Sequence, residues 1–145
     1  MNKLATALVF LLFSTGAAVA DRPATPEERA QVEAALAEIG CTATDIEWDE
    51  SDRRFEVDNA RCGNQGRFDF ELDRNYVIVD GERPVTAQER EQIDAALAKE
   101  GCSGGRAEWD YDDNRFEIDD AICADNQRFE FRLDKDFGLI RMKRD

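Results

Sequence analysis

The chain has 145 residues, with 33 Asp and Glu against 19 Lys and Arg, a formal net charge of −14, and no histidine. This excess of negative charge disfavours nucleic acid as a partner, because phosphates are neutralised by clustered Lys and Arg. The absence of histidine excludes Ser-His-Asp and Cys-His catalysis and nearly all ordinary zinc and copper sites.

Residues 1–20 have the pattern of a secretory signal peptide. Lys3 precedes an apolar run over residues 4–13, and Ala18-Val19-Ala20 fits the small-x-small cleavage pattern. Ten apolar residues are too few to cross a bilayer, so the pattern predicts export with cleavage rather than a membrane anchor. We therefore expect a protein of the bacterial periplasm or a secreted protein, with no membrane span after cleavage.

The remaining chain is a tandem repeat with a period of 61 residues. Residues 22–82 align with residues 83–143 without a gap, and 27 of the 61 positions are identical. The octapeptides FEVDNARC (55–62) and FEIDDAIC (116–123) are the same segment in the two copies. Two copies of about 60 residues indicate a duplicated small domain rather than an open solenoid, so we predict modules at 22–82 and 83–145.

Each repeat is predicted to begin with a helix. The segments TPEE (25–28) and TAQE (86–89) both fit the capping-box pattern at a helix start. Apolar residues then recur at helical spacing, and Gly40 and Gly101 supply the left-handed residue that ends each helix.

Strands are predicted after each helix, because the apolar period changes to two. In the first repeat the alternating segments are 46–49, 55–58 and 67–72, with a shorter one at 76–79, and the second repeat has the same order. We therefore predict an α+β fold of two tandem repeats, each with one N-terminal helix packed on a three- to four-stranded antiparallel sheet.

The four cysteines are predicted to form disulfides, as expected in an exported chain. A duplicated unit should have folded before its duplication, which favours Cys41–Cys62 and Cys102–Cys123 over pairs between repeats. Closing a loop of this size stabilises the fold by about 3 kcal/mol. A redox or metal pair would favour C-x-x-C spacing, which the chain lacks.

Motifs for catalysis or for a cofactor are not found. The acidic run Asp110-Tyr111-Asp112-Asp113-Asn114 resembles a calcium loop, but Arg115 stands where the loop needs glycine and Ala121 where it needs glutamate. Trp48 and Trp109 alternate with charged residues and are assigned to the core. We therefore predict a protein that is not an enzyme, with no metal and no cofactor.

One surface is a candidate for interaction. A single helix per repeat covers one sheet face and leaves the other exposed, where the alternation places rows of carboxylates. A solvated acidic face is the alternative, because acidic residues also keep a protein soluble. The predicted interaction residues are Glu47, Asp49, Glu56, Asp58, Glu108, Asp110, Glu117 and Asp119.

The succession TPEERAQVEAALAEIGC, IEWDESDRRFEVDNA and GRFDFELDRNYVIV resembles a PepSY-like domain, and each repeat matches nearly end to end. The turns at Asp73-Arg74-Asn75-Tyr76 and Asp134-Lys135-Asp136-Phe137 keep the aspartate of that family and lack its glycine. The resemblance implies a non-catalytic extracytoplasmic module that binds or restrains peptidases. We therefore predict an exported binding protein whose partner is a peptidase or another basic protein surface. The alternative is an acidic envelope protein that interacts weakly with cations or cationic peptides.

Overall fold

The computed structural model describes residues 21–145, and the predicted signal peptide at 1–20 lies outside them. None of the helices within 21–145 has the length and apolar character needed to cross a membrane. The elements in chain order are β1 (Arg22–Pro23), α1 (Pro26–Glu38), β2 (Cys41–Thr42), β3 (Asp45–Asp49), β4 (Arg54–Cys62), β5 (Arg67–Leu72), β6 (Ile78–Pro84), α2 (Ala87–Lys99), β7 (Arg106–Asp110), β8 (Arg115–Ile122), a short 3-10 helix (Ala124–Asn126), β9 (Arg128–Asp134) and β10 (Leu139–Arg144).

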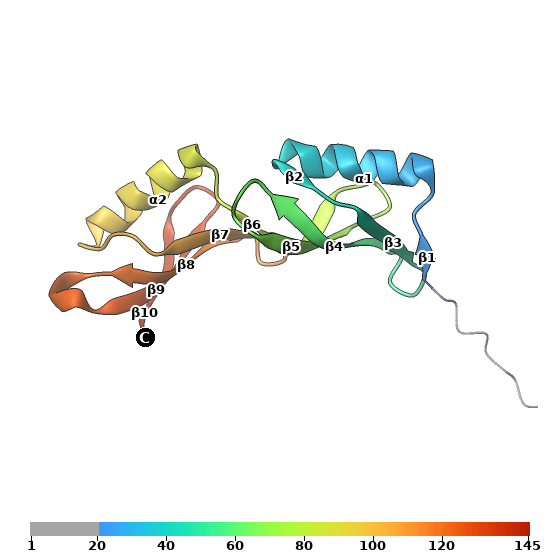
Figure 1. Ribbon diagram of the computed structural model, residues 1–145. Helices are drawn as coiled ribbons and strands as arrows, with labels where there is room; N and C mark the ends of the chain where they lie inside the picture. Colours follow the sequence, from blue (N-terminus) through green and yellow to red (C-terminus); the bar gives the residue numbers. More distant parts are fainter. Residues whose placement is uncertain (1–20) are drawn as a thin grey trace, which may run out of the picture.

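The strands form one antiparallel sheet of ten strands rather than two sheets. Its order is β1-β3-β4-β5-β6-β7-β8-β9-β10, and β2 pairs with β4 beside this path. The two helices lie over the same face of this sheet, one after the other along its width (Figure 1). The predicted architecture of two repeats, each with its own three- to four-stranded sheet, is therefore wrong.

Strand β6 is the reason for the single sheet, because both repeats share it. Its first part pairs with β5, with Gly81 opposite Phe70, and its last part pairs with β7, with Arg83 opposite Trp109. The segment DGER (80–83) has no apolar alternation. The strand predicted from the sequence therefore stops at residue 79, before this segment. Backbone pairing does not require apolar side chains, and the strand continues from one repeat into the next.

Both helices begin as the sequence predicts. The hydroxyls of Thr25 and Thr86 accept hydrogen bonds from the backbone N–H of Glu28 and Glu89, and each glutamate side chain accepts one from the backbone N–H of its threonine. Gly40 and Gly101 follow the helices with φ of 73° and 71°, the left-handed conformation in which glycine has no steric cost.

Each helix buries two aliphatic residues against the sheet: Val32 and Leu36 in α1, and Ile93 and Leu97 in α2. The sheet residues below α1 and α2 form two buried clusters, one in each repeat. The buried sheet residues are Ile46, Phe55, Val57, Ala60, Phe70 and Leu72 in the first cluster and Ala107, Phe116, Ile118, Ala121, Phe131 and Leu133 in the second.

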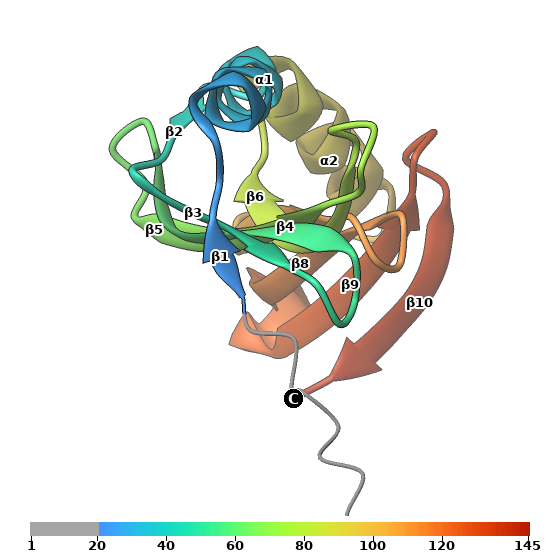
Figure 2. The same ribbon diagram turned by 90° about the vertical axis from the view of Figure 1, so that its right-hand side faces the viewer.

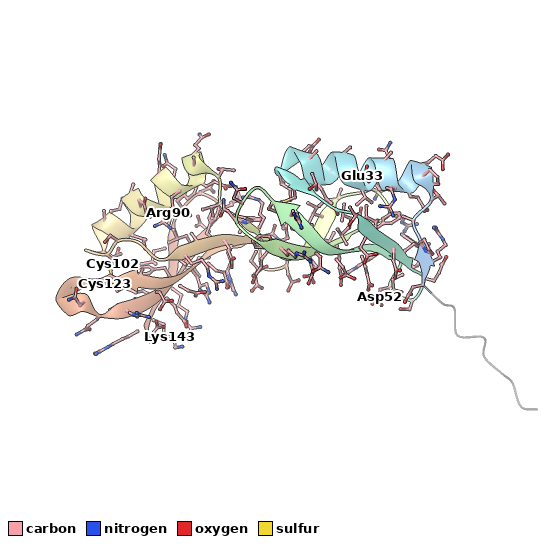
Figure 3. The ribbon with its side chains drawn as sticks, in the orientation of Figure 1. Glu33, Asp52, Arg90, Cys102, Cys123 and Lys143 are labelled. Atoms are coloured by element: carbon pink, nitrogen blue, oxygen red, sulfur yellow. A yellow bond between two sulfur atoms is a disulfide. The ribbon has the colours of Figure 1, made fainter. Side chains whose placement is uncertain are left out.

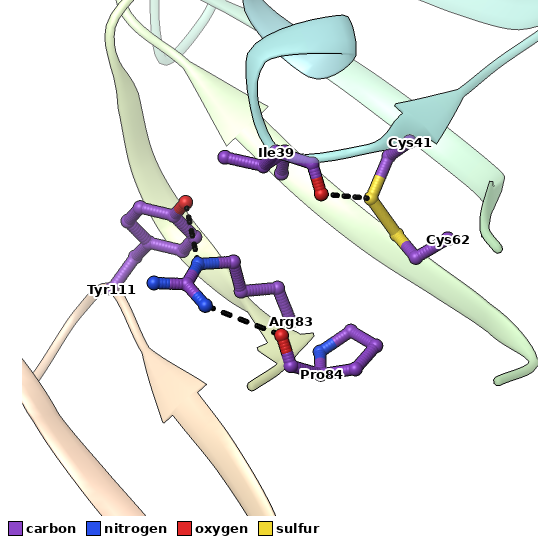
Figure 4. Close-up of a disulfide and its surroundings, with 6 residues drawn as sticks. All are labelled: Ile39, Cys41, Cys62, Arg83, Pro84 and Tyr111. Atoms are coloured by element: carbon purple, nitrogen blue, oxygen red, sulfur yellow. Dashed lines mark hydrogen bonds between the residues drawn. A yellow bond between two sulfur atoms is a disulfide. The ribbon is translucent and has the colours of Figure 1, made fainter. Parts of the chain in front are cut away.

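The two predicted disulfides are present, and each lies within one repeat. Cys41 bonds to Cys62, its direct partner across β2 and β4 (Figure 4). Cys102 bonds to Cys123 in the second repeat. Each bond joins the segment that follows the helix to the end of a sheet strand, at Cys62 in β4 or at Cys123 directly after β8, so it links the helical layer to the sheet.

Contacts at the boundary join the two buried clusters. The ring of Tyr111, at the β7–β8 turn, packs against the first cluster, where it meets Phe70 edge-on with centroids 6.3 Å apart. Its hydroxyl accepts a hydrogen bond of 3.3 Å from Nε of Arg83 (Figure 4). The guanidinium of Arg83 also binds Glu89 at 2.7 Å. The sequence alone did not predict this contact, because Glu50 occupies the equivalent position in the first repeat.

Candidate functional site

The candidate site is the face of the sheet that the helices leave uncovered. Seen from the end of the sheet, both helices lie on one side of the strands (Figure 2). Because successive side chains of a strand point to opposite faces, the residues between the buried ones point away from the helices. Figure 3, in the orientation of Figure 1, shows side chains projecting from the strands on the side away from the helices.

All eight predicted interaction residues lie on this helix-free face, since they alternate with buried residues of β3, β4, β7 and β8. Asp49 differs from the others because it is buried, with 8% of its surface exposed. It accepts hydrogen bonds from the backbone N–H and hydroxyl of Ser51 and from the N–H of Asp52. These bonds hold the pKa of Asp49 below its ordinary value, so this carboxylate stabilises the β3–β4 turn.

In the first repeat, carboxylates form a continuous row across four strands. Glu47 in β3 lies opposite Glu56 in β4, Glu56 opposite Glu71 in β5, and Glu71 opposite Asp80 in β6. We call these four residues the acidic row. Within residues 21–145, Arg54 is the one cation that forms a salt bridge with a member of the row, and it contacts Glu71.

The charge repulsion within the acidic row affects the pKa of Glu56. Partial burial raises its pKa, and repulsion from nearby carboxylates, beginning with Asp49, raises it further. Like charges directly opposite one another on neighbouring strands destabilise a sheet. The row therefore carries excess negative charge that the chain itself leaves largely uncompensated.

The second repeat has a different row at the equivalent positions. Glu108 lies opposite Glu117, Glu117 opposite Arg132, and Arg132 opposite Arg141. Glu117 accepts bonds of 2.8 Å from Arg115 and forms a salt bridge of 2.9 Å with Arg132. The carboxylates of this row are thus paired with cations, unlike those of the first repeat.

Asp119 in the second repeat is also paired with cations, whereas Asp58 in the first repeat lies opposite another carboxylate. In the second repeat Asp119 forms salt bridges with Arg106 at 3.3 Å and with Arg132 at 3.4 Å. In the first repeat Asp58 lies opposite Asp45, another carboxylate. Residues 22–82 contain 16 acidic and 7 basic residues, a net charge of −9, whereas residues 83–143 contain 15 and 10, a net charge of −5. The first repeat is therefore the more acidic half of the face.

Trp48 and Trp109 lie on the opposite, helix-covered side. Each ring meets the phenylalanine across the strand pair edge-on, Phe55 or Phe116, with centroids 4.7 Å apart. Both tryptophans are partly buried and pack against the hydrophobic clusters, which confirms their assignment to the core.

A cleft opens on the helix-free face where the repeats meet. We call it the junction cleft; its volume is about 630 Å³, and Arg67 and Arg106 are the two cations that line it. A smaller hollow of about 240 Å³ adjoins it and shares Asp69 and Asp80. The acidic residues that line the junction cleft are Asp69, Asp80, Glu82, Glu108, Asp110 and Asp112.

Three carboxylates beside the cleft are close enough to hold a metal ion. Oxygens of Glu82, Asp110 and Glu117 lie within 4.8 Å of one another. Burial and repulsion from Glu108, Glu117 and Asp110 raise the pKa of Glu82. Glu117 is already bound by two arginines, so the arrangement supports attraction of positive charge without specifying a metal.

The sequence did not predict the junction cleft. Its walls come from β5, β6 and β7, and they meet only because β6 passes from one repeat to the other. The sequence shows an alternation of carboxylates with their neighbours at Asp80, Glu82, Glu108 and Asp110. It does not show the shared strand that brings these residues together.

Comparison with protein-family models, with curated proteins and with solved structures finds no match for this chain. The resemblance to PepSY-like domains therefore stays a prediction from the sequence.

Proposed function

We propose that this protein is an exported, non-enzymatic binding protein whose helix-free face binds a cationic surface of another protein. The observation that carries the proposal is the acidic row, Glu47, Glu56, Glu71 and Asp80, on adjacent strands with one salt-bridging cation among residues 21–145. A basic partner would relieve the repulsion within this row and gain an electrostatically steered association.

The fold also favours a binding role for this face. Both helices pack on the other side of the sheet, so ten strands present one broad uncovered surface. The junction cleft and the smaller hollow give that surface two depressions lined mainly by carboxylates. A concave acidic surface excludes wrong partners by charge and admits protruding Lys or Arg side chains.

A secreted peptidase is the first partner class to test, because the PepSY resemblance implies it. The assay measures cleavage by purified exported peptidases of the host with and without the chain from residue 21 onward. A saturable change in cleavage rate at one protein per enzyme supports a peptidase partner. Rates unchanged for every peptidase in the panel remove that partner class.

The binding proposal itself is tested by calorimetry with a hexa-arginine peptide at low and high salt. The test variant is Glu47→Gln/Glu56→Gln/Asp80→Asn, and the control is Glu33→Gln/Glu38→Gln/Glu91→Gln, which removes three charges from the helices instead. We expect the test variant to weaken binding at least tenfold and the control less than threefold. Equal weakening by the two variants, or no binding to the unmodified protein, contradicts the proposal.

A further inference from the structure

The first three residues of β5 have no strand beside them on the side of β6. Strand β6 pairs with β5 only from Phe70 to Leu72, so the edge formed by residues 67–69 is open. The two strands separate at Gly81, which has φ of 114°. Its carbonyl accepts a hydrogen bond of 3.0 Å from the N–H of Tyr111, so the backbone of β6 turns there from β5 toward β7.

The second repeat shows what occupies this edge when the strand does not turn away. There β10 continues along β9, with Lys143 opposite Glu130 and Arg144 opposite Phe129. The N–H of Asp145 donates a hydrogen bond of 3.1 Å to the carbonyl of Arg128. Residues 128–130 are the repeat equivalents of residues 67–69, so the same edge is filled by a Lys-Arg-Asp segment in one repeat and is open in the other.

The two strands differ at the position of Gly81. A Cβ on Gly81 would collide with the carbonyl oxygen of Asp69 and lie 2.9 Å from Cδ1 of Phe70, and the positive φ is unfavourable for any other residue. Met142 occupies the equivalent position in β10, where the strand runs straight along β9. The chain therefore fills the edge of β9 with its own strand and leaves the edge of β5 unfilled.

The open edge borders the junction cleft. Arg67, Phe68 and Asp69 line the cleft from β5, and Gly81 and Glu82 line it from β6. By analogy with Arg128, the carbonyl of Arg67 points into the space between β5 and β6, and the period of two places the N–H of Asp69 on the same side. The carbonyl of Asp69 points to this side as well, but it lies against Gly81 of β6. The cleft thus borders a strand edge that β6 does not pair with, and six carboxylates line it.

We propose that the edge of β5 at residues 67–69 accepts an extended, cationic segment of the partner protein as an added strand. This inference rests on the proposed function, and it specifies how the partner is bound. Backbone hydrogen bonds to Arg67 and to the N–H of Asp69 hold the segment, and its Lys or Arg side chains meet the carboxylates of the cleft. The added segment takes the place that Lys143, Arg144 and Asp145 take on β9.

The probe for this site is the labelled peptide LIRMKRD, which copies residues 139–145. The negative control is LIEMEED, in which glutamate replaces the three cations. Binding to the chain from residue 21 onward is measured by fluorescence polarisation. Two substitutions of Arg67 distinguish the contribution of its backbone N–H to peptide binding from the contribution of its side-chain charge. Arg67→Pro removes the N–H that faces the cleft, whereas Arg67→Gln keeps it and removes only a cation.

We expect LIRMKRD to bind with 1:1 stoichiometry and LIEMEED not to bind. Arg67→Pro should weaken binding at least tenfold, while Arg67→Gln should leave it unchanged or tighter. Hydrogen exchange of the unmodified protein provides a second readout that does not depend on the folding of a variant. The bound peptide should slow exchange at the amides of Arg67 and Asp69.

Three outcomes overturn the inference. If Arg67→Pro and Arg67→Gln bind alike, or if protection appears at β9 or β10 instead of β5, there is no added strand at this edge. If hexa-arginine binds and LIRMKRD does not, the strand site fails while the proposed function stands. If neither cationic peptide binds, both proposals fail.

Discussion

The ring of Tyr111 from the second repeat lies edge-on against the ring of Phe70 in the first, with centroids 6.3 Å apart. This contact and the shared strand β6 make one sheet from two copies of a small unit. The equivalent position in the first repeat is Glu50, so an aromatic residue occurs only where a preceding repeat offers a cluster to cover.

Replacing Tyr111 tests this boundary contact. Tyr111→Ala removes a half-buried aromatic ring and should lower the free energy of unfolding by about 2 kcal/mol. Tyr111→Phe removes only the hydrogen bond from Arg83 and should cost about 1 kcal/mol or less. Urea denaturation measures both, with Glu50→Ala as the control at the equivalent position. A Tyr111→Ala protein as stable as the unmodified one would show that the contact contributes nothing.

Gly81 is expected to be the least replaceable glycine at the boundary. Gly81→Ala places a methyl group against the carbonyl oxygen of Asp69 and the ring of Phe70 in a backbone with φ of 114°, and should cost about 3 kcal/mol. Gly66 has a similar φ of 123° with its nearest neighbour at 4.0 Å, so Gly66→Ala should cost only about 1 kcal/mol of conformational strain. Thermal denaturation compares the two. Equal losses would mean that the close approach to Phe70 is unimportant.

We expect the protein to lose stability in acid, because the helix-capping glutamate Glu28 has a lowered pKa. Arg22 donates two hydrogen bonds to Glu28 and lowers the pKa of this carboxyl to about 2. Because the folded-state pKa lies below the unfolded value, the stabilisation is complete above about pH 4.5 and is lost as the pH falls toward 2. Glu28→Gln should therefore cost about 1 kcal/mol at pH 7 and progressively less as the pH falls from 4.5 through 2, with the melting temperature as the measurement.

The second repeat supplies a comparison for Glu28. Arg83 lowers the pKa of Glu89 through the same pair of hydrogen bonds, and Arg83 is 13% exposed where Arg22 is 39% exposed. Weaker screening by solvent should make Glu89→Gln more costly than Glu28→Gln at pH 7. The reverse order would contradict the role assigned to burial.

We expect the contribution of the acidic row to the free energy of unfolding to have the opposite dependence on pH. The pKa of Glu56 is raised, so its unfavourable contribution is complete above the folded-state pKa and disappears as the pH falls below its ordinary value of 4.5. Glu56→Gln should raise the free energy of unfolding at pH 7 by about 0.5 kcal/mol and have no effect at pH 3. The control Glu91→Gln, on α2, should change stability at neither pH. Destabilisation by Glu56→Gln at pH 7 would show that the row is not repulsive.

The local structure of each repeat could be predicted from the sequence, because short-range signals determine it. The capping boxes of Thr25 and Thr86 fixed the helix starts, and the equal spacing of Cys41–Cys62 and Cys102–Cys123 gave the disulfides. The alternation in β3, β4, β7 and β8 placed the eight carboxylates on one face, although Asp49 is buried in the β3–β4 turn.

The arrangement of the repeats could not be predicted in the same way. It depends on the path of the backbone at Gly81, which no side-chain periodicity reveals. A repeated sequence suggests two equivalent units, whereas one strand here serves both. The junction cleft follows from that shared strand and was missed for the same reason.

Binding at the acidic row is tested most directly by titrating the isotope-labelled chain from residue 21 onward with hexa-arginine and following the backbone amide chemical shifts in NMR spectra. We predict saturable shifts concentrated in β3, β4, β5 and β6, around Glu47, Glu56, Glu71 and Asp80. The Glu47→Gln/Glu56→Gln/Asp80→Asn variant should lose these shifts. Shifts spread evenly over both helices and both repeats, or no shifts at all, would contradict binding at the acidic row.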